Sequence, residues 1–241
     1  MAALNPPSYE EWVDECFRYK RPELGTYYTG FVPTEKVAYD HDELTGEIYA
    51  PLLAAYMTRL FEAPGFIADR FTDDEIAGGT HFLFGAEAGC LREVRSGAVA
   101  PEVLLRCLRA VGTLYTDLFD RVCGARGQRP DEELKARIDS DVYMIWDMDS
   151  LDYAVTTDWP DGPCTEAGLT ILEAALMRCR TSACRQSALH GIGHLLMQQP
   201  REGDGAIRDR LRGLVDRFLG EKQPPEWLAE YAREARAGRV M

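Results

Sequence analysis

His190 and His194 lie four residues apart, a spacing that places both imidazoles on one side of a helix. Such a pair is a frequent way of holding a metal ion. The zinc-protease arrangement also needs a glutamate directly after the first histidine, and here that position is Gly191, so the general base of that mechanism is missing. A third ligand would have to come from His41, His81, a cysteine or a carboxylate far along the chain.

The sequence leaves three interpretations of this pair open. On a helical wheel the two imidazoles share their side with small residues, opposite an apolar stripe, and this environment is typical of a seam between helices. We therefore interpret His190 and His194 first as structural groups hydrogen-bonded between neighbouring helices, and we predict no cofactor. Contact with a partner is the second interpretation. The third is a metal-dependent enzyme centred on the pair, with His81 or a carboxylate of residues 139–152 completing the site.

Residues 131–161 combine ten acidic side chains with several aromatic ones and only two basic residues. If residues 131–157 form one helix, three of the acids project from the same side, close to two of the aromatic rings. Carboxylates mixed with aromatic rings suit the recognition of Arg and Lys side chains. The sequence therefore predicts a partner-binding surface made of Asp141, Trp146, Asp149, Asp152 and Tyr153.

Two alternatives remain for the same acidic segment. It is either a solvated helix face or a calcium or magnesium site, because Asp147, Asp149 and Asp152 follow one another closely. The segment lacks the glycine and the terminal glutamate of a calcium-binding loop.

The charge of the chain limits its partners. Forty acidic residues against 27 basic ones give a net charge of −13, which repels phosphate backbones. We therefore expect neither nucleic acid nor an anionic membrane as the main partner. A basic protein surface would instead be attracted, above all to residues 1–179, which carry −16 of that charge.

The cysteines and the N-terminal residues predict a cytoplasmic protein. Seven cysteines are an odd number without the paired spacing of a secreted disulfide scaffold, which favours a reducing compartment. Cys179 and Cys184 flank an expected turn, but their spacing of five suits no standard zinc knuckle. Residues 1–9 lack the features of a signal peptide, and no apolar run approaches the ~20 residues needed to cross a bilayer.

Helix signals recur along the chain, and sustained strand-like alternation does not. Capping boxes at Ser8/Glu11 and Thr72/Glu75 predict two helix starts, and Pro and Gly clusters predict several ends. We expect about nine helices in one domain spanning 1–241, with residues 1–41 partly irregular. The expected ranges are 8–20, 42–62, 72–96, 101–123, 131–157, 165–179, 183–199, 205–220 and 225–237.

Residues 184–195 resemble the second helix of a HEAT-type repeat, whose pattern is aliphatic-Arg-x-x-Ala-x-x-Ala-Leu-Gly-x-Leu. The matching positions are Cys184, Arg185, Ala188, Gly191, Ile192, Gly193 and Leu195. A weaker copy spans residues 103–114, and Gly112 lies 81 residues before Gly193, as two repeats of about 40 residues would place it. The resemblance implies an all-α fold of antiparallel helical hairpins stacked as a short α-solenoid. The 187–194 and 231–238 runs are also similar to a group of bacterial proteins without an assigned function.

The sequence thus favours a non-enzymatic binding or scaffold module whose acidic surface engages a basic protein partner. A specific form of this prediction is an immunity protein that neutralises a cationic toxin. The alternative from another class is the metal-dependent enzyme centred on His190 and His194.

Overall fold

The fold is all-α. The computed structural model describes residues 7–18, 46–85, 90–96, 99–124, 137–148, 151–199 and 201–240, and these contain helices and no strand. The described helices are α1 (Tyr9–Arg18), α2 (Gly46–Glu62), η2 (Pro64–Phe66), α3 (Ile67–Arg70), α4 (Asp73–Phe84), α5 (Cys90–Ser96), α6 (Pro101–Leu114), η3 (Tyr115–Phe119), α7 (Asp120–Val122), α8 (Arg137–Tyr143), η4 (Met144–Trp146), α9 (Leu151–Val155), α10 (Pro163–Glu173), η5 (Ala174–Arg178), α11 (Ser182–Met197), α12 (Gly205–Lys222) and α13 (Glu226–Arg236).

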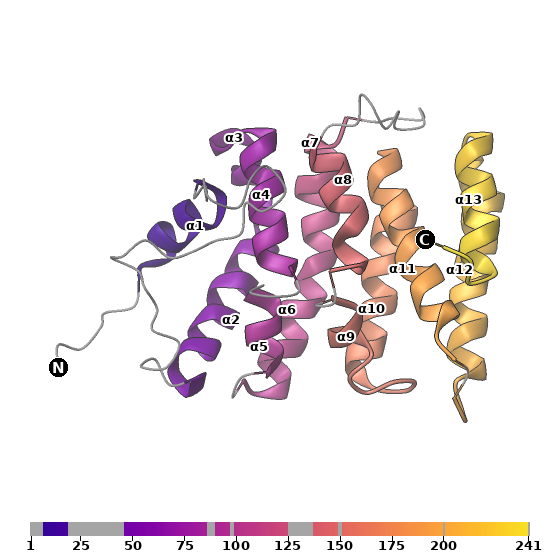
Figure 1. Ribbon diagram of the computed structural model, residues 1–241, viewed down its shortest axis with the longest axis horizontal. Helices are drawn as coiled ribbons and strands as arrows, with labels where there is room; N and C mark the ends of the chain where they lie inside the picture. The colour runs from indigo at the N-terminus through magenta and orange to yellow at the C-terminus, as the bar shows by residue number, and fades with distance from the viewer. Residues whose placement is uncertain are drawn as a thin grey trace.

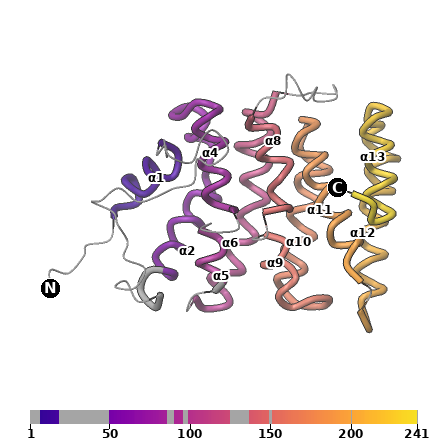
Figure 2. Tube along the Cα trace, in the orientation of Figure 1, coloured from indigo at the N-terminus to yellow at the C-terminus, as the bar shows by residue number. Residues whose placement is uncertain are grey.

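The helices lie side by side and follow one another along the long axis of the molecule (Figures 1 and 2). Contacts join α2 to α6 and α6 to α10 in one row, and α1, α4, α8, α11 and α13 in a second row. One hydrophobic core runs through both rows, from Tyr9 to Val240. The all-α prediction is confirmed, while the HEAT-like solenoid stays a prediction.

Both capping boxes form as the sequence predicts. The Glu11 amide donates to Ser8 Oγ at 3.3 Å, and the Ser8 amide donates to Glu11 Oε2 at 2.8 Å. Thr72 and Glu75 repeat the exchange at 3.3 and 2.8 Å. Each box satisfies amide donors that a helix start otherwise leaves without a partner, and so fixes where α1 and α4 begin.

Two of the expected helices are interrupted. The helix predicted over 72–96 ends at Gly85, whose backbone is extended, and a separate helix α5 begins at Cys90. The helix predicted over 131–157 lies partly outside the described residues, and its described part breaks at Asp147 after the 3-10 turn η4. The premise that Asp141 and Asp152 share one side of a continuous helix is therefore wrong.

Three exposed ion pairs between helices span the same number of residues along the chain. Arg106 on α6 binds both carboxylate oxygens of Glu62 on α2, at 2.7 and 2.8 Å. Two further Glu–Arg pairs join α10 to α12. The three pairs, Glu62–Arg106, Glu166–Arg210 and Glu173–Arg217, each span 44 residues of sequence. Such exposed pairs each contribute little stability.

Among the described residues, no helix is both long enough and apolar enough to cross a membrane.

Candidate metal centre

Helix α11 carries both histidines and is fixed at its start and along its length. The Asp120 carboxylate accepts hydrogen bonds from the Arg180 and Thr181 amides, at 2.6 and 2.7 Å, just before α11 begins. The buried Ser187 hydroxyl donates to the Val142 carbonyl of α8 at 2.6 Å, and it lies 2.7 Å from the hydroxyl of Tyr115. These bonds fix the helix relative to α8, and therefore fix where the imidazoles lie.

Gly191 lets the segment that carries Asp147 approach α11 closely. A Cβ atom at this position would lie 2.4 Å from the Trp146 indole, so only glycine permits the contact. Trp146 ends the 3-10 turn η4, and Asp147 follows it in a turn closed by a hydrogen bond from its amide to the Met144 carbonyl. The Trp146–Gly191 contact thus brings the Asp147 carboxylate to the histidines.

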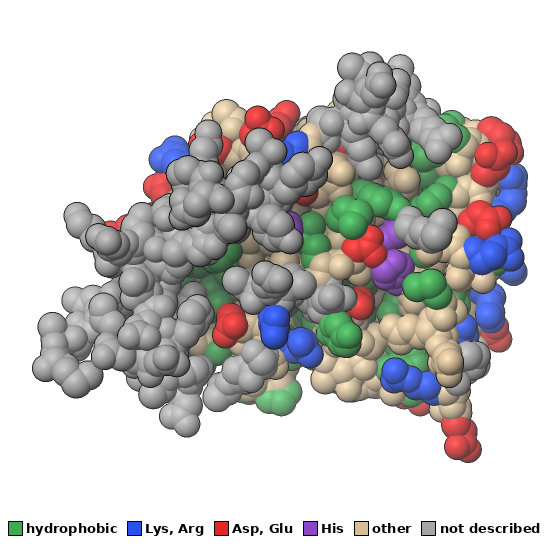
Figure 3. All heavy atoms as spheres, in the orientation of Figure 1, with side chains coloured by type: hydrophobic (Ala, Val, Ile, Leu, Met, Phe, Trp, Pro, Cys, Tyr) green, Lys and Arg blue, Asp and Glu red, His purple; other side chains and the backbone are tan. Residues whose placement is uncertain are grey.

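Asp147 contacts both histidines at once. His190 Nε2 lies 2.8 Å from Asp147 Oδ2, and His194 Nε2 lies 2.8 Å from Asp147 Oδ1. The two rings lie 4.5 Å apart between centroids. The His190 side chain is fully buried, whereas His194 and Asp147 are 21% and 24% exposed. This partial exposure leaves one side of the cluster open to solvent, and Figure 3 shows histidine side chains on the visible face.

Two tyrosines lie behind His190. The Tyr231 hydroxyl of α13 lies 2.6 Å from His190 Nδ1 and 3.2 Å from the Tyr143 hydroxyl of α8. Burial, and then the neighbouring Tyr143, raise the pKa of Tyr231 above its ordinary range, and burial also raises the pKa of Tyr143. Both phenols therefore stay protonated at neutral pH and act as hydrogen-bonding groups that orient the ring of His190.

The three side chains offer a donor set that suits a divalent transition metal. One ligand atom each from Asp147, His190 and His194 lies within 4.8 Å of the other two. Two imidazoles and one carboxylate are typical ligands of zinc and non-haem iron. Around a tetrahedral zinc ion, ligand atoms lie about 3.3 Å apart, so the 2.8 Å contacts require the partly exposed carboxylate to retract by roughly half an ångström.

The residues predicted to bind a partner do not form one exposed surface in the described structure. Trp146 is 1% exposed, and the Asp141 carboxylate lies 3.5 Å from the Arg137 guanidinium. Asp152 is partly buried, and the adjacent Tyr153 is 54% exposed. Asp149 lies outside the described residues. A partner-binding role for these five residues stays a prediction.

A second group of ligand-type side chains is entirely buried. Atoms of Asp120, Cys179 and Cys184 lie within 4.8 Å of one another. The Asp120 carboxylate already accepts two backbone amides, and Cys179 Sγ donates to the Tyr115 carbonyl at 3.5 Å. Because Asp120 and Cys179 already have hydrogen-bond partners and all three side chains are buried, we interpret the group as part of the packing. None of the seven cysteines forms a disulfide.

Sequence reasoning found the two histidines but did not single out Asp147 or Tyr231. Asp147 belongs to the acidic segment expected to supply a carboxylate, and only the break of the helix distinguishes it from its neighbours. The other candidate ligand, His81, lies on α4 and does not join the cluster, and His41 lies outside the described residues. A signal was present in Gly191, which marks the point on α11 where another segment approaches.

The chain matches no protein-family model, no curated protein and no solved structure.

Proposed function

We propose that this protein is a metal-dependent enzyme whose ion is held by Asp147, His190 and His194. The observation that carries the proposal is that each of two imidazole nitrogens lies 2.8 Å from an oxygen of one carboxylate, in a cluster that is partly exposed. Three protein ligands leave a coordination position for water or substrate, which is the arrangement of catalytic rather than structural zinc sites.

The proposed ion would activate a water molecule for hydrolysis. A zinc ion with this kind of ligand set lowers the pKa of bound water to about 7, which supplies hydroxide at neutral pH. His190 would bind through Nε2, and its Nδ1–H would then donate to the Tyr231 oxygen 2.6 Å away. Hydrogen bonds of this kind fix the ring and strengthen the ligand. The partial exposure of His194 and Asp147 provides the route by which substrate would reach the ion.

Metal analysis tests the proposal. The protein purified from medium supplemented with zinc should carry about one ion per chain, and His194→Ala and Asp147→Asn should each lose it, because two ligands bind far more weakly than three. The matched control is His81→Ala, which removes a histidine of α4 outside the cluster. Circular dichroism of each variant separates loss of the ion from loss of the fold.

The same experiment can contradict the proposal. A wild-type protein without bound metal, whose melting temperature zinc does not raise, would leave the histidines as a hydrogen-bonded seam between η4, α11 and α13. Ion binding to the native state must raise the melting temperature, so a rise supports the proposal and the absence of a rise contradicts it.

Binding of a basic protein is the second candidate function. The charge of −13 and the exposed ring of Tyr153 beside Asp152 favour it. In this form the protein is a cytoplasmic scaffold or immunity protein of the HEAT-like class, and the absence of disulfides suits a reducing compartment.

Co-expression with a basic protein encoded beside this chain tests the second candidate. A complex that forms in low salt and is weakened by Asp152→Lys and Tyr153→Ala would support it. The control is Asp209→Lys, a reversal at an exposed carboxylate of α12. If Asp152→Lys and Asp209→Lys weaken the complex equally, the interaction depends only on net charge and not on this surface.

A further inference from the structure

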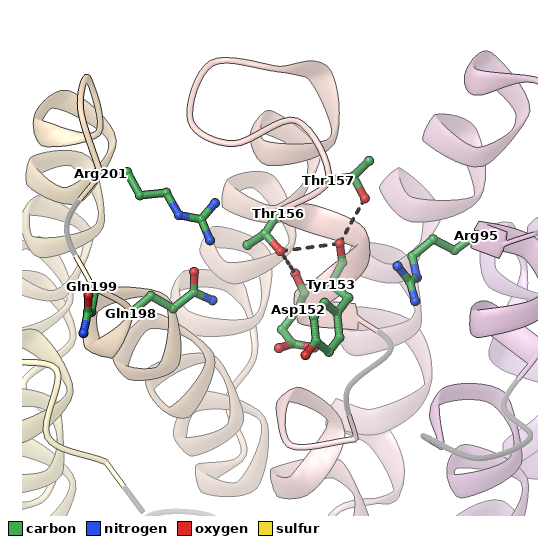
Figure 4. A pocket seen from close by; sticks show the side chains of 8 residues that line it. All are labelled: Arg95, Asp152, Tyr153, Thr156, Thr157, Gln198, Gln199 and Arg201. Carbon is green, nitrogen blue, oxygen red and sulfur yellow. Dashed lines mark hydrogen bonds between the residues drawn. The ribbon is translucent and has the colours of Figure 1, made fainter.

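A cavity of about 630 Å³ lies at the end of α11, and two arginines reach into it from opposite sides. Figure 4 shows Arg95 of α5 and Arg201, which precedes α12, both directed toward the Asp152–Thr157 segment that lies between them. The volume is within the range of small-molecule sites, which measure about 300–1,000 Å³. The cavity is therefore large enough for a metabolite-sized ligand.

Within the described part of the chain, these two guanidinium groups differ from most others because they have no ion-pair partner. Arg106, Arg210 and Arg236 illustrate the usual arrangement, in which a guanidinium binds a carboxylate of a neighbouring helix. Among the described residues, neither Arg95 nor Arg201 forms such a pair. Arg95 lies over the Tyr153 ring, 5.4 Å from its centroid, and its buried Nε atom has no hydrogen-bond partner.

The other polar groups of the cavity suit an anionic ligand with additional polar atoms. With Asp152 as the third charged residue, the lining carries a net charge of +1 in a protein of −13. The Thr156 hydroxyl donates to the Asp152 carbonyl at 2.7 Å, so its oxygen can still accept a hydrogen bond. In Figure 4 the Gln198 amide points toward the same segment. These groups would recognise the part of a ligand that carries no charge.

The cavity adjoins the candidate metal centre through two separate segments. Gln198 caps the C-terminal end of α11 one turn beyond His194, and its amide donates to the His194 carbonyl at 3.3 Å. On the other segment, Asp147 is followed five residues later by Asp152, which lines the cavity. The cavity is therefore lined by continuations of the two segments that carry the ligands of the proposed ion.

We propose that this cavity binds the substrate of the metal centre, a small molecule whose carboxylate or phosphate groups pair with Arg95 and Arg201 from the two sides of the cavity. The planar guanidinium matches both oxyanions with two parallel hydrogen bonds, which is why arginine is preferred over lysine in such sites. The assignment of the ligand as a substrate rests on the proposed metalloenzyme function, whereas the anion site itself does not.

Calorimetric titration with inorganic phosphate and with succinate tests the inference and identifies which oxyanion the site prefers. Arg95→Gln and Arg201→Gln should each weaken binding of the preferred anion about tenfold, the loss typical of one charge-assisted hydrogen bond. Arg109→Gln is the matched control, because Arg109 is an exposed residue of α6 away from the cavity, and it should change the affinity less than about twofold. Arg95→Lys keeps the charge without the planar fork and should fall between wild type and Arg95→Gln.

Two outcomes would overturn the inference. One is a titration in which neither anion binds, or in which Arg109→Gln weakens binding as much as Arg95→Gln. The other is binding lost in His194→Ala but kept in both cavity variants, which would place the anion on the ion itself. Anion binding that needs Arg95 and Arg201 but persists in chelator-treated protein supports the anion site. If the wild-type protein also fails to bind added zinc, the anion site stands and the metal centre is rejected. The two failures are thus distinguishable.

Discussion

Gly191 lies directly against the Trp146 indole, and a Cβ atom there would be 2.4 Å from the ring. The contact belongs to two segments 45 residues apart in sequence, and it is what brings Asp147 to the histidines. Packing this tight leaves no room for even one methyl group.

Gly191→Ala should therefore lower the free energy of unfolding by about 1–3 kcal/mol, because the ring or the backbone must move to accept the methyl group. The same variant should lose bound zinc, since Asp147 follows Trp146 directly. Urea unfolding and metal analysis measure the two effects. Gly213→Ala is the control: no atom lies within 4 Å of its Cβ position on α12, so alanine should raise stability by up to about 1 kcal/mol. Similar values for both variants would contradict this account.

Tyr231→Phe should weaken zinc affinity about 10- to 100-fold while leaving the fold intact, because it removes the oxygen that orients His190. Competition with a chelating dye measures the affinity. Tyr153→Phe, which removes an exposed hydroxyl, should leave the affinity unchanged. An unchanged affinity in Tyr231→Phe would show that the hydroxyl does not support the ion.

His81 should make stability depend on pH. Burial, and then the nearby Arg137, lower the pKa of His81 in the folded state from about 6.5. The unfolded chain consequently binds a proton at this ring in a pH range where the folded chain does not. The free energy of unfolding therefore falls as the pH decreases below about 6.5, and this decrease ends at the pKa of His81 in the folded state. His81→Gln should reduce the difference in stability between pH 8 and pH 5, as measured by urea unfolding. An identical difference in both proteins would refute the assignment.

Asp120→Ala should destabilise the start of α11. The carboxylate accepts the Arg180 and Thr181 amides, and its loss leaves buried donors without an acceptor, at a cost of about 1–3 kcal/mol. Thermal and urea unfolding measure the change. Asp209→Ala, at a carboxylate that is 80% exposed, should change stability by less than about 0.5 kcal/mol. If the two variants lose equal stability, the Asp120 hydrogen bonds are not holding the helix.

Local signals were enough to predict where many helices begin. Ser8/Glu11 and Thr72/Glu75 are complete within four residues, so their hydrogen bonds follow from sequence alone. The break at Asp147 was not predictable in this way. It depends on the contact between Trp146 and a glycine of a distant helix, and tertiary contacts of this kind override helix propensity.

The candidate site was also predictable only as far as local sequence signals define it. The four-residue spacing of His190 and His194 fixes their common side without any other information. Which carboxylate joins them depends on how α8 packs on α11, and five acids of residues 139–152 were candidates. Tyr231 comes from α13, 41 residues beyond His190, and no local pattern connects the two.

The recurring Glu–Arg interval has a consequence for how the length of this protein can change. The 44 residues that separate Glu62 from Arg106 also separate two pairs between α10 and α12. Residues added to or removed from a loop between two partners would change this interval and leave both partners on their helices. Because exposed pairs of this kind contribute little stability, we expect the bridges to place no strict limit on the length of those loops.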